Sequence, residues 1–276
     1  MTDWHAIALG FLQGFSEWLP ISSTAHLAVA LRLFGLSDAE GLGAAFTAVT
    51  QLGSVLAALV YFRKDILNVL LRSPSSAGQQ DPNRADRRLL LPIAVGTIPV
   101  VVCGVLFRHA IEGQLRSMTV ISSSMITFGV ILAWAESRAS GRRNISSVSV
   151  YDGLAVGIGQ AFSLIPGASR SGTTITAALA IGLERATAAR FSFLLSLPAI
   201  TAAGLFELIQ RRHDIAAAGM TRATVLATVV AFVVGWASID FLLKFLRRHP
   251  TYVFVVYRVV VGALIFGLMA MGSLRP

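Results

Sequence analysis

Six predominantly apolar stretches, each about 20 residues long, constrain this chain more than any other feature. They cover roughly residues 42–62, 88–107, 117–136, 187–209, 220–243 and 252–272. A helix of about 20 residues crosses the roughly 30 Å hydrocarbon core of a bilayer, because each residue adds about 1.5 Å. The stretches predict an all-α polytopic membrane protein with six transmembrane helices, since a membrane β-barrel would show short alternating strands.

The composition supports this prediction. The chain is 55% hydrophobic and 13% charged, whereas soluble domains carry about 25% charged residues. A net charge of +9 would suit nucleic-acid binding, but basic loops between apolar stretches set topology and contact anionic lipid. We therefore expect membrane lipid, and no nucleic acid, among the partners. The one cysteine, Cys103, excludes an intrachain disulfide and a cysteine metal cluster.

Two further segments, roughly 5–34 and 151–182, differ from the six. Each is about 30 residues long and is interrupted by proline and serine, at Pro20 and at Pro166. An unbroken helix of that length would measure ~45 Å, too long for one untilted crossing. Polar, broken backbone at membrane depth is tolerated only where protein or a water-filled cavity surrounds it. Both segments are therefore predicted to be re-entrant helical hairpins.

The two interrupted segments also resemble each other. The stretch QGFSEWLPISST from Gln13 aligns with QAFSLIPGASRS from Gln160, and QLGSVLAA from Gln51 aligns loosely with SLPAITAA from Ser196, at an offset near 145 residues. We predict one integral membrane domain, 1–276, made of two repeats, 1–140 and 141–276. Each repeat has one hairpin and three spans, so the second lies inverted. Inverted repeats place a site at their interface, near the midplane.

Loop charges are compatible with this topology. If the first hairpin enters from outside, 14 Lys and Arg residues lie in inner loops and 7 in outer loops, as the positive-inside rule requires. If both interrupted segments simply crossed the membrane, the best split would be 13 to 8. Charge alone therefore barely separates the two topologies, and the polar hairpins and the repeat favour the first.

The first interruption carries groups that could do chemistry. Gln13 and Glu17 are four residues apart, so a helix presents them on one face. An ionisable residue at membrane depth is a functional hypothesis by default; the alternative is a structural carboxylate paired with an arginine. Ser22 or Ser23 could cap the following helix, and either could reach His26. His26 could instead be a packed core histidine.

The second interruption, PGASRSGTT from Pro166 to Thr174, is predicted to bind an anion. Gly167 and Gly172 allow close ligand approach, and the guanidinium of Arg170 suits phosphate oxygens. A helix starting near Gly172 would point free N–H groups at the same place. Hydroxyl donors come from Ser169, Ser171, Thr173 and Thr174. The alternative is a serine-rich loop with Arg170 reaching a surface. No Walker lysine follows, which excludes a nucleotide P-loop.

Together the two interruptions predict phosphoryl transfer inside a membrane. Glu17 would hold a divalent metal that bridges phosphate oxygens. A hydroxyl or imidazole would attack phosphorus, and Arg170 and the metal would stabilise the charge that develops.

At these residues the chain resembles the undecaprenyl-diphosphate phosphatase family, also known as the bacitracin-resistance family. That family's first motif, E/Q-x-x-x-E-x-x-P-x-S-S-T-x-H, stands here as Gln13 to His26, and its second, P-G-x-S-R-S-x-x-T, as Pro166 to Thr174. Their order and spacing, the chain length and the span pattern agree over essentially the whole chain.

The resemblance implies a multi-pass enzyme of the bacterial plasma membrane whose site opens outward. It would hydrolyse undecaprenyl diphosphate to the monophosphate carrier and confer bacitracin resistance, with Mg²⁺ or Ca²⁺ as cofactor and a homodimer as a possible state. Glu17 becomes the metal or acid–base residue, Ser23 the favoured nucleophile and His26 the alternative nucleophile or proton carrier. Arg170 binds phosphate, with Gln13 beside Glu17 at the metal. Further substrate contacts are expected from Ser22, Thr24, Gly167, Ser169, Ser171, Thr173 and Thr174.

Two positions depart from the family pattern. Many members have glutamate where Gln13 stands, so the metal would lose one anionic ligand here. Many also have an acidic residue after the phenylalanine that precedes the QLG motif, where this chain has Thr47 after Phe46. Both departures put the metal preference and affinity in doubt.

Alternatives remain open at this stage. A polyprenyl-phosphate flippase would use the same inverted repeats and the same Arg170, but no nucleophile. The paired-histidine type of membrane lipid phosphatase has a signature that this chain lacks. Arg258, inside the last apolar stretch, could pair with Glu17 or Asp240, or could reach the membrane surface. Gln51 could line the cavity or bond to backbone.

Overall fold

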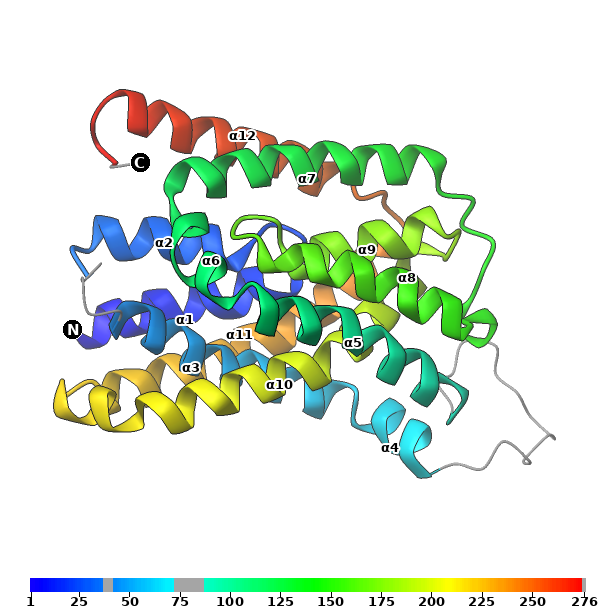
Figure 1. Cartoon of the computed structure of the whole chain (residues 1–276), viewed down its shortest axis with the longest axis horizontal. Coiled ribbons are helices and arrows are strands. Elements are labelled where there is room, and N and C mark those ends of the chain that lie inside the picture. The colour runs from blue at the N-terminus through cyan, green and yellow to red at the C-terminus, as the bar shows by residue number, and fades with distance from the viewer. Residues whose placement is uncertain (37–41, 72–86, 275–276) are drawn as a thin grey trace.

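The computed structural model describes residues 1–36, 42–71 and 87–274, and its named elements are all helices (Figure 1). The first part of the chain forms α1 (Asp3–Trp18), α2 (Ser23–Leu33), α3 (Leu42–Tyr61), α4 (Arg63–Leu71), η1 (Arg87–Leu89), α5 (Leu90–Leu106), α6 (Arg108–Glu112), η2 (Gln114–Arg116) and α7 (Met118–Arg138). The rest forms η3 (Ile145–Ser147), α8 (Val150–Ala161), η4 (Phe162–Leu164), α9 (Arg170–Ala180), α10 (Arg185–Ala217), α11 (Thr221–Leu246) and α12 (Tyr252–Ala270).

The described helices fit a polytopic membrane protein. Five of them are long and apolar enough to cross a bilayer: Arg87–Leu106, Met118–Arg138, Arg185–Ala217, Thr221–Leu246 and Tyr252–Ala270. The pair Ala45–Tyr61 and Arg63–Leu71, bent by 67°, counts as a sixth when the two helices are taken as one broken span. Large apolar side chains stay exposed on these helices, such as Val105 at 73% and Leu106 at 70%. Such a surface requires lipid around it, so the predicted all-α polytopic membrane fold is confirmed.

The two interrupted segments fold into helical hairpins. α1 packs beside α2, and α8 packs beside α9. Figure 1 shows the first hairpin starting at the end of the molecule that holds the N-terminus and the second starting at the opposite end, so that their tips meet inside the bundle. The hydroxyl of Ser171 in the second tip donates to the carbonyl of Leu19 in the first at 2.8 Å. The division into repeats 1–140 and 141–276 stays a prediction.

Glycines allow α5 and α8 to approach closely. A Cβ added to Gly157 would lie 2.1 Å from the carbonyl oxygen of Gly96, and one added to Gly153 would lie 2.3 Å from that of Pro92. Side chains larger than hydrogen therefore do not fit between these helices. This contact fixes the last turn of α8, which carries Gln160.

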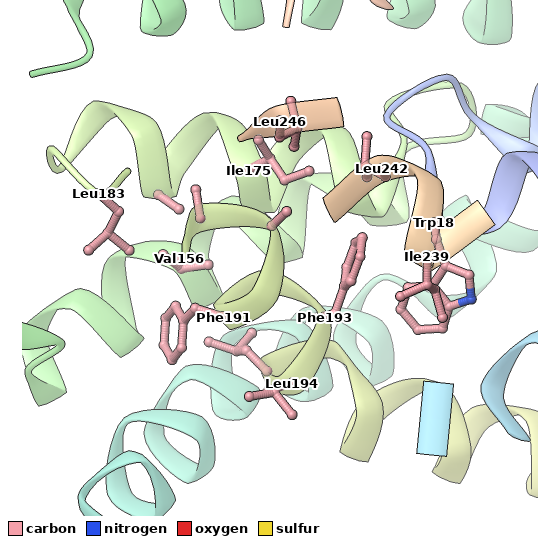
Figure 2. Packing of buried hydrophobic residues seen from close by; sticks show 14 of the residues in the cluster. Trp18, Val156, Ile175, Leu183, Phe191, Phe193, Leu194, Ile239, Leu242 and Leu246 are labelled. Carbon is pink, nitrogen blue, oxygen red and sulfur yellow. The ribbon is translucent and has the colours of Figure 1, made fainter. Parts of the chain in front are cut away.

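Buried apolar side chains from several helices pack directly behind the hairpin tips. Figure 2 shows Trp18 of α1 beside Ile239 of α11 and near Phe193 of α10. The Trp18 and Phe193 rings meet edge-on with centroids 4.9 Å apart, and the indole N–H of Trp18 donates to the carbonyl of Ser54 at 3.2 Å. This core holds the residue next to Glu17 in one orientation.

An ion pair closes the base of the second hairpin. Arg143 donates to both carboxylate oxygens of Asp152, at 2.9 and 2.6 Å, and also to the carbonyl of Ile181 just after α9. Asp152 and Ser149 form a capping box at the start of α8. Burial alone would raise the pKa of Asp152, but hydrogen bonds from Arg143 and Ser149 outweigh it and lower that pKa below its usual value.

Candidate active site

Both hairpin tips contain a serine N-cap with a positive φ angle. Each second helix begins after a serine in the left-handed region, Ser22 at φ 73° and Ser169 at φ 69°. Each serine is the N-cap, and its hydroxyl accepts from the backbone N–H three residues on, at Ala25 and Gly172. Non-glycine residues rarely adopt positive φ, and such strain gathers at functional sites. The first helical residues presented by the two tips are Ser23 and Arg170.

Arg170 therefore begins α9, two residues earlier than the helix start near Gly172 that the sequence predicts. Gly167 in the same tip has φ 90°, and a Cβ there would lie 2.3 Å from the carbonyl oxygen of Ile121. Only glycine fits this position, because both the backbone angle and the space exclude a side chain.

Glu17 is the centre of a hydrogen-bond network between the hairpins. It is 6% exposed, and its Oε2 accepts from the Nε2 of Gln13 at 2.7 Å and from the Oγ of Ser23 at 2.8 Å. Its Oε1 accepts from the Nε2 of Gln51 at 2.9 Å and from the guanidinium of Arg170. Four donors thus satisfy the buried carboxylate, as its burial requires.

Arg170 reaches Glu17 from the other hairpin. The two form an ion pair, and the guanidinium carbon of Arg170 lies 5.6 Å from the ring centroid of Trp18, a cation–π geometry. The side chain of Arg170 is 13% exposed, so the predicted alternative, an arginine reaching a surface, is wrong. The charges of the two tips meet at one place, as the sequence predicts.

A cavity of about 210 Å³ opens beside this pair. Drug-sized ligands occupy pockets of about 300–1,000 Å³, so this one holds a small polar group rather than a long lipid. Its polar lining comes from both tips and from α3: Glu17, Ser22, Ser23, Thr24, Gln51, Gln160, Ser163, Ser169 and Arg170, with Gly167. Val100, Leu164, Ala199, Ile200 and Ala203 line the apolar part. Gln51 therefore lines the cavity, the first of the two positions that the sequence allowed for it.

Three hydroxyls predicted to contact substrate are used elsewhere. The hydroxyls of Thr173 and Thr174 donate to the carbonyl of Arg170 at 3.1 and 2.8 Å, and Ser171 bonds to the first tip, as described above. None of the three is among the residues that line this cavity. They fix the backbone that carries Arg170, because short hydroxyl side chains bond readily to carbonyls three or four residues earlier.

His26 is turned away from Ser23. Its Nδ1 lies 2.7 Å from the carbonyl oxygen of Ser22, and its Nε2 lies 2.6 Å from the hydroxyl of Tyr257. A carbonyl only accepts, so Nδ1 carries the proton and Nε2 accepts from Tyr257. The ring does not line the cavity. In this arrangement His26 holds the strained Ser22 backbone, and the hydroxyl of Ser23 pairs with Glu17 instead.

Comparisons with known proteins identify the family of the chain. A family model described as "Bacitracin resistance protein BacA" matches residues 6–264. The chain belongs to this family. A protein named undecaprenyl-diphosphatase from Myxococcus xanthus (strain DK1622) is 47% identical, covering 99% of this chain and 91% of that relative. Proteins of the same name are 44% identical in Chlorobium chlorochromatii (strain CaD3), over the full length of both, and 43% in Mycobacterium ulcerans (strain Agy99), over 99% of each.

The oxygen atoms at the centre of this BacA-family chain fit one kind of cation site. Within the described residues no three His, Cys, Asp or Glu side chains gather as a metal cage. The cavity offers the carboxylate of Glu17, the hydroxyl of Ser23 and, if its amide turns, the oxygen of Gln51; Gln13 lies behind Glu17 and bonds to it. Mg²⁺ commonly binds through one or two carboxylates plus substrate phosphates, whereas Ca²⁺ takes six to eight oxygens. This donor set suits Mg²⁺ that arrives with a phosphorylated substrate.

Arg258 on α12 is a site residue whose role the sequence did not reveal. It is 0% exposed, so it does not reach the membrane surface, and in the described part of the chain it pairs with neither Glu17 nor Asp240. Its guanidinium donates instead to five backbone carbonyls, those of Pro20, Ser124, Met125, Gly167 and Ala168, at 2.8–3.4 Å. Because these carbonyls include both hairpin tips, Arg258 holds the tips against each other and against α7.

Proposed function

We propose that the chain is an undecaprenyl-diphosphate phosphatase, which hydrolyses this lipid diphosphate to the monophosphate and inorganic phosphate. The relatives that match nearly its full length carry the name undecaprenyl-diphosphatase. The observation that carries the proposal is one carboxylate, Glu17, that accepts from the hydroxyl of Ser23 and from Arg170. A nucleophile, its base and a phosphate-binding cation thus share one small cavity.

In the first step, the Oγ of Ser23 bonds to the terminal phosphorus while its proton passes to Oε2 of Glu17, 2.8 Å away. The bond from that phosphorus to the bridging oxygen breaks, and the lipid monophosphate leaves with the electron pair. Arg170 leaves Glu17 for the phosphate oxygens, where its fork matches two of them. Glu17 then returns its proton to the departing oxygen.

In the second step, Glu17 takes a proton from water, whose oxygen bonds to the phosphorus of the phosphoserine. The bond from phosphorus to Oγ of Ser23 breaks, Glu17 returns the proton to that Oγ, and inorganic phosphate leaves. Glu17 can serve both steps because it is a free carboxylate again once the first is complete. A bound Mg²⁺, held by Glu17 with Gln51, would neutralise charge on the phosphate oxygens. Arg170 is largely buried, and the low dielectric around it strengthens its pull on the phosphoryl group.

A flippase is the second candidate, because broken helices from opposite sides are the pattern of transporters. A flippase needs Arg170 to bind the headgroup but needs no activated hydroxyl. The hydrogen bond from Ser23 to a buried carboxylate favours the hydrolase, because a flippase does not need an activated hydroxyl to carry a phosphate across.

The location proposed is the bacterial plasma membrane, with the cavity opening to the outer side. Figure 1 puts the segments that join α7 to α8, α9 to α10 and α11 to α12 at one end of the molecule. These segments and their neighbouring turns carry Arg138, Arg142, Arg143, Arg185, Arg190, Lys244, Arg247 and Arg248. The positive-inside rule supports a cytoplasmic location for this end. A homodimer stays a prediction, and light scattering of the detergent-purified protein would measure it.

The orientation can be tested at Thr24, which is exposed and lines the cavity. Thr24→Cys in a Cys103→Ala background gives the chain a single thiol. An impermeant thiol reagent should label it in intact cells from outside. Labelling only from the cytoplasmic side of inverted vesicles would show that the orientation is wrong.

The activity is tested by phosphate release from undecaprenyl diphosphate, using detergent-purified protein with Mg²⁺, with Ca²⁺ or with chelator. We expect metal-dependent release that falls at least about 100-fold in Arg170→Ala, because a charged hydrogen-bond donor to the reacting group is lost. Arg222→Ala is the matched control, since Arg222 forms an exposed ion pair with Asp3. No release by folded wild-type protein with any metal would refute the hydrolase and favour the flippase.

A further inference from the structure

Gln160 is a buried polar residue that the structure leaves without partners. It lies at the end of α8 and is 0% exposed, yet neither its Nε2 nor its Oε1 has a hydrogen-bond partner in the described part of the chain. It also lines the cavity beside Glu17 and Arg170. Burying an amide without partners is costly, and native proteins rarely do so without a reason. A ligand that enters the cavity can satisfy both atoms.

The aligned tips explain why this amide is free. Gln13 occupies the equivalent position in the first hairpin, and its Nε2 donates to Glu17 four residues later. Four residues after Gln160 the chain has Leu164, so the second hairpin keeps the amide but lacks the carboxylate that would engage it. Packing alone does not require glutamine here, because methionine or leucine would fill a similar volume without stranded polar atoms.

The surroundings indicate which chemical group the amide meets. The other polar residues that the second hairpin contributes to the cavity are Arg170, Ser163 and Ser169, which are cationic or neutral donors. An amide N–H together with these donors suits a phosphoryl oxygen. The apolar lining is also close by, because Leu164 is one helical turn from Gln160 and Val100 belongs to α5, which packs on α8. A group held here lies between the phosphate-binding arginine and an apolar wall.

We propose that Gln160 binds the phosphoryl group that stays on the lipid, the leaving group of the reaction. This assignment rests on the proposed function, in which the terminal phosphoryl group lies against Ser23 and Glu17 of the first tip. The phosphoryl group nearer the lipid then faces the second hairpin, and the first isoprene units lie along Val100, Leu164 and Ile200. The Nε2 of Gln160 donates to an oxygen of the departing monophosphate and so stabilises the charge that it gains.

The test compares product inhibition of wild type, Gln160→Met and a control, Ser192→Ala. Ser192 is also buried with an unpartnered hydroxyl, but it does not line the cavity. In Gln160→Met the inhibition constant of a polyprenyl monophosphate should rise about 10- to 100-fold, the range for a hydrogen bond to a charged group. The inhibition constant of inorganic phosphate should stay within about twofold, and the melting temperature should not fall. Ser192→Ala should leave both inhibition constants unchanged.

Three outcomes would overturn the proposal. An increase confined to inorganic phosphate would assign Gln160 to the terminal phosphoryl group. Unchanged inhibition constants would exclude a ligand role for Gln160. A lower melting temperature in Gln160→Met with unchanged inhibition constants would make the amide structural. If wild-type protein releases no phosphate, direct binding of the polyprenyl monophosphate is measured instead, so failure of the proposed reaction does not hide the result for Gln160.

Discussion

Replacing Glu17 separates its role as a base from its role as the partner of Arg170. In Glu17→Gln the new amide oxygen can keep the bonds from Gln51 and Arg170. The new Nε2 then faces Gln13 and Ser23, which now donate to Oε2. The amide of Gln13 can rotate and the hydroxyl of Ser23 can turn, so that both accept from the new Nε2. The variant therefore keeps the geometry and loses only the negative charge.

The two expected magnitudes differ. Loss of a general base lowers kcat by about 10²- to 10⁴-fold, equal to about 3–5 kcal/mol of barrier. Stability in Glu17→Gln should fall by only about 1–2 kcal/mol, because Arg170 keeps a hydrogen-bond acceptor there. In Glu17→Ala, by contrast, Arg170 loses its acceptor while remaining largely buried. Leaving such a charge unpaired costs about 3–5 kcal/mol, so only this variant should melt much earlier.

The assay measures phosphate release and thermal unfolding of wild type, Glu17→Gln and Glu17→Ala in the same detergent. Mg²⁺ is titrated for each protein, so that weaker metal binding is not mistaken for loss of a base. The KM of Glu17→Gln should not rise, because Arg170 is freed from a competing carboxylate. A kcat within tenfold of wild type at saturating Mg²⁺ would refute Glu17 as the base. A higher KM with normal kcat would make it a binding residue.

Three further predictions concern the parts that hold the site. Arg258→Lys should lower the melting temperature and should lower kcat/KM at least about tenfold. The reason is that three ammonium donors replace the five donors of the guanidinium, which bond to carbonyls of both tips. Wild-type values of both quantities would contradict the role given to Arg258. Gly157→Ala should destabilise the protein by about 1–3 kcal/mol, because the new Cβ would lie 2.1 Å from the Gly96 carbonyl oxygen. Gly267 has open space around it, so Gly267→Ala should leave the melting temperature unchanged. Because folding lowers the pKa of Asp152, the ionised carboxylate stabilises the fold at neutral pH. This stabilisation is lost as the pH falls through the lowered pKa. The melting temperatures of wild type and Asp152→Asn should therefore differ at pH 7 and converge in acid.

The sequence predicts features that depend on local pattern and on membrane physics. Hydropathy and length give the spans, and the prolines at positions 20 and 166 give the hairpins, because broken polar backbone cannot face lipid. The meeting of Glu17 and Arg170 follows from two tips that enter from opposite sides. Each of these inferences uses residues close in sequence or a constraint that applies to every membrane protein.

Side-chain direction is where sequence reasoning fails. A spacing of three residues suggests that Ser23 faces His26. In the structure, Ser23 is the first residue of its helix and donates to Glu17 of α1. The imidazole of His26 instead bonds to the hydroxyl of Tyr257 on α12. Arg258 suggests a carboxylate partner, since buried charges are usually paired. Three of its five acceptors are carbonyls that the broken tips leave outside regular helices, and a sequence does not show where such carbonyls gather.

The likeness of the two tips explains why they must also differ. The same strained serine cap presents Ser23 on one side and Arg170 on the other. Had both tips kept a glutamate at the position of Glu17, two buried carboxylates would face one small cavity and repel each other strongly at low dielectric. Leu164 removes that second charge, and Arg170 supplies the opposite one. The difference between two similar hairpins thus gives a base and a phosphate-binding cation in contact, with Gln160 left free to meet the substrate.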